Sequence, residues 1–178
     1  MITIRPATVS DADFLAGLAA RTFSEAFGAD NRPEDLALHL ATAYGVERQA
    51  AELRDPAVTT LFAETDGSVA AFAQLRRGSS PPCIEAHRPI ELWRFYVDRP
   101  WHGRGVAQEM MQAVIDAAIT GGHDVLWLGV WDRNPRAQAF YRKSGFDDVG
   151  SQPFVVGTDE QNDRVMVRPL REPSIRTT

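Results

Sequence analysis

The sequence predicts one domain of the α/β class (α+β), with a mixed sheet and helices packed against it. Short apolar or alternating segments of strand length occur along the whole chain, and helical segments separate several of them. Some strands follow each other through a tight turn and others through a helix, so we expect both hairpins and crossovers, and therefore a mixed sheet. A chain of 178 residues has room for a core of its own. We expect residues 1–170 to form this domain and residues 171–178 to be a loose tail.

The N-terminal half contains the first strands and the first helices. Pro33 suits the first position of a helix, and Asp66-Gly67 is a strong signal for a short hairpin turn between two strands. The segments expected here are a strand at 2–5, a helix that begins near residue 12 and is broken at 28–32, helices at 34–44 and 46–53, and strands at 59–64 and 68–76.

The C-terminal half alternates strands and helices before it ends in two strands. Asn134-Pro135 is typical of a helix start, with Asn as the cap, and Gly145 suits the left-handed position after the helix end. The segments expected here are strands at 92–97 and 124–131, helices at 108–118 and 135–145, and strands at 146–156 and 164–170, the last two joined by a polar turn at 157–163.

Composition narrows the functional classes. A net charge of −5 without any Lys/Arg run argues against nucleic-acid binding. Cys83 is the only cysteine, so no internal disulfide can form, and a reducing cytoplasmic location is expected. No signal segment or membrane-spanning run is recognisable, so we expect no membrane partner. His39, His87 and His123 are scattered without ligand spacing, so we expect no metal site.

The most informative segment runs from residue 91 to residue 118. An apolar strand at 92–97 leads through a turn into His102-Gly103-Arg104-Gly105-Val106-Ala107, and a helical segment follows. Such a turn binds anions, because free N–H groups point out of the first helical turn and the helix dipole favours negative charge there. Glycines let a phosphate approach the backbone closely. We therefore expect a phosphate-bearing cofactor on residues 102–107.

Two common phosphate-binding templates do not fit this turn. The loop of nucleoside triphosphatases ends in Gly-Lys-Ser/Thr, which is absent here. The dinucleotide fingerprint needs a small residue three places after Gly105, where this chain has Gln108. A nucleotide-binding α/β domain is therefore disfavoured.

The turn resembles that of the GNAT superfamily of acetyl-CoA-dependent N-acetyltransferases, which reads Gln/Arg-x-x-Gly-x-Gly/Ala after a strand. Gly105 and Ala107 match this pattern, and His102 stands where the family has Gln or Arg. The resemblance extends over about residues 2–170. It implies a mixed, mostly antiparallel sheet of about seven strands flanked by about four helices, with acetyl-CoA as the cosubstrate.

A second signature of the same family resembles residues 126–146, with Asn134 at a helix start and Tyr141 inside that helix. In relatives the asparagine commonly bonds the pantetheine arm, and the tyrosine often lies against the cofactor sulfur and protonates the leaving thiolate. The family fold also opens a gap beside the central strand for the pantetheine arm. The implied cofactor-binding residues are Phe95, Tyr96, Val97, His102, Gly103, Arg104, Gly105, Val106, Ala107, Asn134 and Tyr141.

The chemistry that the resemblance implies needs few side chains. Backbone donors near Phe95 to Val97 can stabilise the oxyanion, and Tyr141 is the expected acid. Glu91 begins the central strand, where some family members carry a base glutamate, and it is our candidate base. Strict strand alternation would put Glu91 on one face with Trp93, Phe95 and Val97.

The sequence supports direct transfer of an acetyl group from acetyl-CoA to a primary amine, because Cys83 lies outside both signatures. We expect the amine to belong to a small molecule or to a peptide or protein. The pattern Phe154-x-Val156-Gly157 with Asp163-x-x-Met166 resembles the polyamine- and small-molecule-acetylating branch. The resemblance places the acceptor pocket around residues 23–44 and 78–89. A non-catalytic acyl-CoA sensor on the same fold stays open, as does a homodimer.

Overall fold

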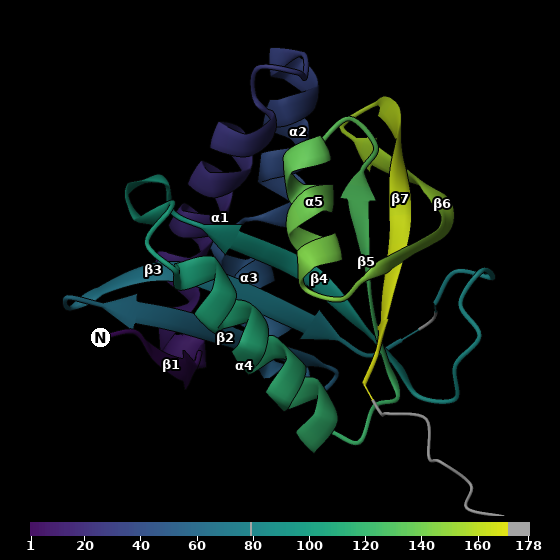
Figure 1. Cartoon of the computed structure of the whole chain (residues 1–178). Helices are drawn as coiled ribbons and strands as arrows, with labels where there is room; N and C mark the ends of the chain where they lie inside the picture. Colours follow the sequence, from purple (N-terminus) through teal and green to yellow (C-terminus); the bar gives the residue numbers. More distant parts are fainter. Residues whose placement is uncertain (79, 171–178) are drawn as a thin grey trace, which may run out of the picture.

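The computed structural model describes residues 1–78 and 80–170 of the chain (Figure 1). The expected C-terminal tail, residues 171–178, lies outside the described residues. The described chain has seven strands, five α-helices and two short 3-10 helices, Val9–Asp11 and Arg99–Trp101. The longer elements are β1 (Thr3–Pro6), α1 (Ala12–Phe27), α2 (Pro33–Ala43), α3 (Val46–Arg54), β2 (Val58–Thr65), β3 (Ser68–Arg76), β4 (Pro89–Val97), α4 (Val106–Thr120), β5 (Val125–Trp131), α5 (Pro135–Lys143), β6 (Asp147–Val156) and β7 (Asp159–Pro169).

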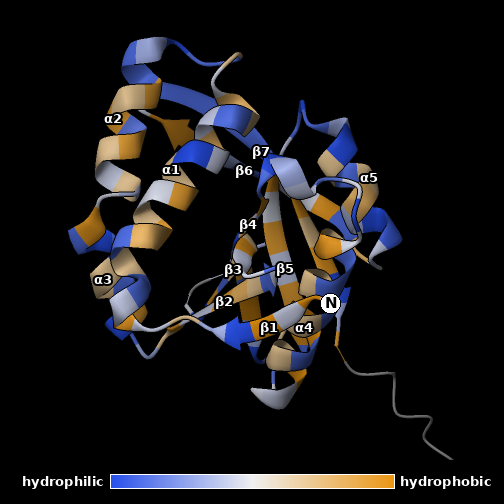
Figure 2. Ribbon diagram, turned by 90° about the vertical axis from the view of Figure 1, so that its left-hand side faces the viewer, coloured by the Kyte–Doolittle hydropathy of each residue, from blue (hydrophilic) through white to orange (hydrophobic). Residues whose placement is uncertain are grey.

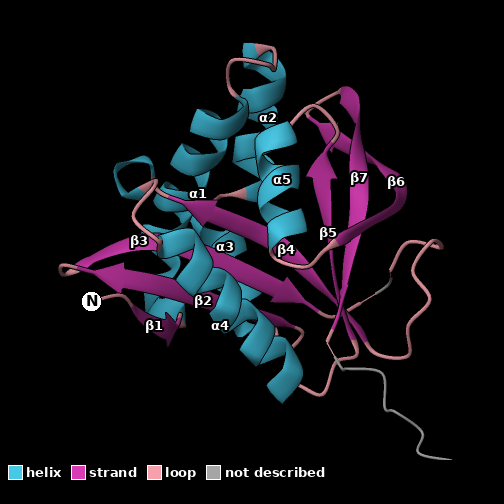
Figure 3. Cartoon of the chain, viewed as in Figure 1, coloured by secondary structure: helices cyan, strands magenta, loops and turns pink. Residues whose placement is uncertain are grey.

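All seven strands form one mixed sheet, as the sequence predicts. The spatial order is β1-β2-β3-β4-β5-β7-β6, and every neighbouring pair is antiparallel except β4 and β5. The parallel β4–β5 pairing covers only three residue pairs and ends at Glu91 and Trp127. Beyond that point the two strands diverge (Figure 3). This divergence divides the sheet into two halves and opens a gap between them.

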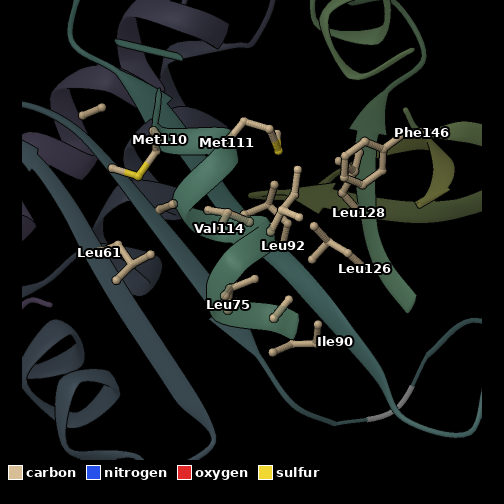
Figure 4. Close-up of a cluster of buried hydrophobic side chains, with 14 of the residues drawn as sticks. Leu61, Leu75, Ile90, Leu92, Met110, Met111, Val114, Leu126, Leu128 and Phe146 are labelled. Atoms are coloured by element: carbon tan, nitrogen blue, oxygen red, sulfur yellow. The ribbon is translucent and has the colours of Figure 1, made fainter. Parts of the chain in front are cut away.

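The helices cover the two faces of the sheet unequally. α1, α2 and α3 lie on one side, and α4 and α5 lie on the other (Figure 2). The larger hydrophobic core lies between the sheet and α4, and Figure 4 draws part of it. Its labelled members are Leu61, Leu75, Ile90, Leu92, Met110, Met111, Val114, Leu126, Leu128 and Phe146. A second, smaller core under α1 contains several aromatic rings, among them Phe23, Phe62 and Phe72.

The turn and cap signals of the sequence are confirmed. Asp66 and Gly67 both have positive φ, 51° and 74°, which is the conformation that a two-residue hairpin turn requires. The Asn134 side chain caps α5 by accepting a hydrogen bond from the Ala137 N–H. Gly145 follows that helix with φ 84°. The described chain has five α-helices rather than the about four that the resemblance implies, and the helix expected at 46–53 is present as α3.

The strict alternation expected for β4 is wrong. Pairing with β3 passes from Leu92–Leu75 directly to Arg94–Gln74, so Trp93 occupies a β-bulge. The extra residue reverses the alternation. Phe95 and Val97 consequently pack on the α4 side with Leu92, whereas Arg94 lies on the side of α3.

The prediction of a polar turn at 157–163 is also wrong for most of its length. The turn is confined to Gly157 and Thr158, and β7 already begins at Asp159. The first residues of β7 are almost entirely polar, so no alternation of apolar and polar residues predicts this part of the strand from the sequence. As a result, Gln161 and Asp163 extend from a strand and not from a turn. Within the described residues, no helix is long and apolar enough to cross a membrane.

Candidate active site

The gap between β4 and β5 opens into a cleft with a volume of about 1200 Å³. Its walls come from α1, α2, β4, the turn before α4, β5, α5, β6 and β7. Both sequence signatures therefore meet in one cavity. None of the described residues in the 78–88 loop lines it, and Cys83 in that loop lies against the β6 bulge at Gly150. The expected contribution of residues 78–89 to this cleft is thus not found among the described residues, and side chains of β6 and β7 line it instead.

The turn before α4 presents free backbone donors. Gly103 and Gly105 have φ of 75° and 83°, and α4 starts directly after Gly105. Among the described residues, the N–H groups of residues 103–107 have no hydrogen-bond acceptor. Five neighbouring unpaired N–H groups at a helix start form a site for an anion such as a phosphate.

His102 closes this turn onto the end of β4. Its Nε2 atom lies 2.8 Å from the carbonyl oxygen of Val97. The imidazole therefore links the turn to the end of the strand. This contact gives the His102 side chain a role in the turn, although the family has Gln or Arg at this position. We infer a positioning contribution for this side chain, beside the backbone contribution expected from the sequence.

Positive side chains accompany the turn, and the sequence reasoning missed two of them. Arg99 and Arg136 line the cleft, and neither guanidinium is hydrogen-bonded to a described residue. The Arg104 guanidinium lies 5.3 Å from the centre of the Trp101 ring. Arginines that line the same cleft as the unpaired backbone N–H groups fit a ligand with several phosphates. No sequence pattern marks Arg99 and Arg136; only the fold brings them to the same cleft.

The end of β4 offers a second set of unpaired backbone groups. The Asp98 N–H bonds to Ala70 in the β3 direction, so Val97 and, by alternation, Phe95 direct their N–H groups to the opposite side. On that side β5 has already diverged. Phe95, Tyr96 and Val97 all line the cleft. This edge fits an extended, amide-bearing arm that pairs with β4 like a strand.

Tyr141 extends from α5 into the same cleft. It packs edge-to-face against Phe95, Phe140 and Phe146, with ring centres 5.6 to 6.3 Å apart. Burial raises the pKa of the Tyr141 phenol well above its ordinary value. The hydroxyl therefore stays protonated at neutral pH, as a proton donor must. Asn134 also lines the cleft, with its oxygen committed to the α5 cap.

Glu91 lines the cleft at the point where β4 and β5 separate. Its side chain is only 12% exposed, and one carboxylate oxygen accepts hydrogen bonds from Arg76 at 2.7 and 2.9 Å. Burial raises the pKa of Glu91, and Arg76 and Arg94 partly oppose this shift. The other carboxylate oxygen has no hydrogen-bond donor among the described residues. Glu91 is thus an ionisable group with one oxygen free to accept a proton.

No group of His, Cys, Asp and Glu in the described part of the chain is arranged to hold a metal ion. The site consists instead of a phosphate turn, an unpaired strand edge and a tyrosine that remains protonated. An arrangement of this kind defines a protein that binds an acyl carrier with several phosphates and an amide-bearing arm.

Comparison with known proteins gives the family. The model of the acetyltransferase (GNAT) family matches residues 20–146, and the chain belongs to this family. It is an enzyme, an N-acetyltransferase that uses acetyl-CoA. The alternatives of a non-catalytic sensor and a nucleotide-binding domain are therefore set aside.

Relatives match the chain to different extents. An uncharacterized N-acetyltransferase of Mycobacterium tuberculosis (strain ATCC 25618 / H37Rv) is 38% identical over 162 residues, which are 91% of this chain and 99% of the relative. Another, from Lactobacillus delbrueckii subsp. lactis, is 28% identical and covers 96% of this chain and 99% of its own length. N-alpha-acetyltransferase RimI of Mycobacterium tuberculosis is 30% identical over 56% of this chain and 58% of its own length.

Solved structures share the fold. The PaiA N-acetyltransferase from Thermoplasma acidophilum, solved in complex with coenzyme A, has a TM-score of 0.75 at 18% identity and covers 95% of this chain and 99% of that one. The ribosomal-protein-S18-alanine N-acetyltransferase from Escherichia coli has a TM-score of 0.66 at 19% identity, with 100% and 99% coverage. Both likenesses concern the fold alone.

Proposed function

We propose that the protein transfers an acetyl group from acetyl-CoA directly to a primary amine, with both substrates bound in one complex. The observation that carries this proposal is the continuity of the cleft, which runs from the phosphate turn to the side chains of α1, α2, β6 and β7. Both substrates can therefore meet without an acetylated enzyme. Cys83, the only thiol, is outside the cleft.

Acetyl-CoA supplies the acetyl group as a thioester, and the protein's own residues do the rest. The N–H groups of residues 103–107 bind the phosphates, Asn134 contributes a side-chain contact, and the β4 edge from Phe95 to Val97 binds the arm. A backbone N–H of the same edge stabilises negative charge on the carbonyl oxygen, which typically contributes about 2.7–4 kcal/mol per donor. The side chains that move protons are Tyr141 and Glu91.

Tyr141 is the proposed acid and Glu91 the proposed base. The Tyr141 hydroxyl donates its proton to the departing sulfur, and the protonated state of this buried phenol supports the role. Glu91 receives a proton from the attacking amine, directly or through water, on the carboxylate oxygen that Arg76 leaves free. Attack requires a neutral amine, whereas free aliphatic amines have a pKa of about 10. A proton acceptor in the cleft is therefore needed near neutral pH.

The acceptor is proposed to be a small-molecule amine, in agreement with the resemblance of residues 154–166 to the small-molecule and polyamine branch. The aromatic and amide side chains that β6 and β7 contribute to the cleft support this choice, because they offer apolar and hydrogen-bonding contacts to a small molecule. Because one relative is an N-alpha-acetyltransferase, the N-terminal amine of a peptide is the second candidate acceptor.

Replacement of Tyr141 by Phe tests the proposed mechanism. With an amine panel and thiol release as the readout, Tyr141→Phe should lower turnover by about 10²–10⁴-fold. The acetyl-CoA dissociation constant should stay within a few-fold, because the ring and its packing remain. Tyr44→Phe is a matched control, since it removes another phenol hydroxyl that lines the cleft. Unchanged turnover in Tyr141→Phe would exclude Tyr141 as the acid.

Initial rates and Cys83→Ala test direct transfer. Double-reciprocal plots at several amine concentrations should intersect, as expected when both substrates bind before reaction, and Cys83→Ala should retain activity. Parallel lines together with loss of activity in the cysteine variant would point to a covalent acetyl-enzyme instead.

A further inference from the structure

Asp163 is a buried carboxylate that has no charged or hydrogen-bonding side-chain partner in the described part of the chain. It extends from β7 into the cleft, is only 8% exposed, and has no ion pair or side-chain hydrogen bond with any described residue. In the sheet it lies between Trp131 of β5 and Gln152 of β6. Buried carboxylates are normally paired, because an unpaired buried charge is costly. Because Asp163 lines the cleft, a ligand bound there can supply the partner.

The backbone of β5 leaves this carboxylate accessible. Gly129 lies two residues before Trp131 on the same face, and a Cβ at this position would be 2.9 Å from a carboxylate oxygen of Asp163. It would also be 2.8 Å from the amide nitrogen of Gln152. Any side chain here would crowd both groups, so glycine keeps the space in front of them open.

Aromatic rings border the same part of the cleft. Trp131 packs edge-to-face against Phe27 of α1, and Phe154 of β6 does so against His39 of α2, with ring centres 6.0 and 5.9 Å apart. Burial and Arg94 lower the pKa of His39, so its ring is neutral at neutral pH. Aromatic faces attract organic cations. A carboxylate beside several rings is therefore suited to a positively charged group.

Each arginine of the cleft that forms an ion pair does so with a carboxylate other than Asp163. Arg76 is paired with Glu91, and Arg48 and Arg94 are paired with Glu52. The charged group that acts on Asp163 is Asp132 at the end of β5. The Arg133 guanidinium lies 4.8 Å from the centre of the Trp131 ring. The next residue of β7, Arg164, is paired with Asp148.

We propose that Asp163, Trp131 and Phe154 bind a positively charged group of the acceptor, so that the enzyme acetylates an amine that carries a second cationic centre. This inference rests on the proposed function, since it concerns the acceptor side of the same cleft. The bound cation is not the nitrogen that reacts. A nearby carboxylate favours the protonated form of an amine, and a protonated nitrogen has no lone pair for attack. Asp163 therefore determines specificity, and the reacting nitrogen lies elsewhere on the same molecule.

The ionisation of Asp163 gives this subsite a pH dependence. Burial and the neighbouring Asp132 raise the pKa of Asp163 to about 7. Below that pH the carboxyl is neutral and attracts a cation weakly; above it, the carboxylate is charged. Cation binding should therefore strengthen as the pH rises through about 7, up to the pH at which the ligand itself loses its charge.

The test compares diaminoalkanes of increasing chain length with monoamines of the same lengths, using the wild type and Asp163→Asn. At about pH 8.5, where a carboxyl with a pKa of about 7 is ionised, the wild type should prefer a diamine of suitable length. Asp163→Asn should lower the ratio of kcat/KM for diamine over monoamine by about 10- to 100-fold, the usual effect of a lost charge-assisted contact. The loss should appear mainly in KM, as expected for a binding group.

Asp132→Asn is the matched control. It removes a carboxylate from the adjacent turn that does not line the cleft, and the diamine preference should persist. An unchanged preference in Asp163→Asn would overturn the proposal. So would an equal fall of kcat for monoamines and diamines, which is the mark of a role in proton transfer.

A second measurement separates this inference from the proposed function. Binding of an alkyl-trimethylammonium ion, which cannot be acetylated, is followed by calorimetry in the presence of CoA. The wild type should bind this probe and Asp163→Asn should bind it about 10-fold or more weakly. If no amine of the panel is acetylated but this difference is present, the proposed acceptor class fails while the cation subsite stands. If the wild type does not bind the probe, the subsite is wrong.

Discussion

Glu91 and Asp163 are two carboxylates of one cleft in different surroundings, and this difference separates their roles. Glu91 has Arg76 as a partner, so its charge is compensated and it can accept a proton without first attracting a cation. Asp163 has no ion-pair or side-chain hydrogen-bond partner among the described residues, and in our proposal a cationic group of the acceptor compensates its charge. The sequence identifies Glu91 by its place at the start of a strand. It includes Asp163 in a pattern that resembles one branch of the family but not among the site residues, because the strand that carries Asp163 begins with a run of polar residues at 158–164.

Replacement of Glu91 by Gln tests the proposed base. The rate should fall at neutral pH, because the variant cannot accept a proton, and it should recover partly at high pH, where more free amine is present. Burial raises the pKa of Glu91, so the wild-type rate should decline with falling pH already above the ordinary range of a glutamate. The measurement is the pH profile of kcat and kcat/KM for both proteins. Glu64→Gln, which removes an ion-paired glutamate outside the cleft, is the control. A higher KM with unchanged kcat at every pH would make Glu91 a binding group instead.

The phosphate turn and α5 could be predicted in detail because local rules determine them. Glycines at positive φ, an Asn cap and the Asp66-Gly67 hairpin each leave a mark within a few residues of sequence. The bulge in β4 leaves no such mark. It arises from pairing with β3, and it moves Phe95 and Val97 to the opposite face from the one that alternation predicts. Tertiary pairing also explains β7, whose polar start is a strand because it lies between β5 and β6.

Replacement of Gly105 by Val tests the anion site at the level of this turn. A β-branched residue at φ 83° is strained, so the backbone must move and the N–H groups lose their common orientation. The acetyl-CoA dissociation constant should rise by about 100-fold or more, which corresponds to about 2.7 kcal/mol. Isothermal calorimetry measures it.

Gly67→Val is the control that separates the effect of backbone strain on stability from the effect on acetyl-CoA affinity. Gly67 has φ 74° and, like Gly105, has no atom within 4 Å of its Cβ position, but it lies in the β2–β3 hairpin. Both variants should lose stability to a similar extent, and only Gly105→Val should lose affinity. Equal acetyl-CoA affinity in the two variants would refute the assignment of the turn.

At the level of the whole molecule, the two halves of the sheet meet through only three parallel residue pairs. The half made of β1 to β4 contributes one wall of the cleft, and the half made of β5 to β7 contributes the other. α4 packs against both through the larger core. Because a ligand that lies along the β4 edge also contacts β5 and α5, acetyl-CoA binding should join the two halves where the strands do not.

Hydrogen exchange tests this view. In the free protein, the N–H groups of Phe95 and Val97 and those of residues 103–107 lack acceptors among the described residues, so they should exchange quickly. Saturating acetyl-CoA should slow exchange at both places, and at about 100 times the dissociation constant it should add about 2.7 kcal/mol to the free energy of unfolding. Strands β1 and β2 should change little, since they are remote from the cleft.

Gly105→Val should lose the protection of the turn and of β4 together, because the phosphates anchor the arm. Protection confined to residues 103–107 would show that the arm does not pair with β4, and the unpaired strand edge would then serve another part of the reaction.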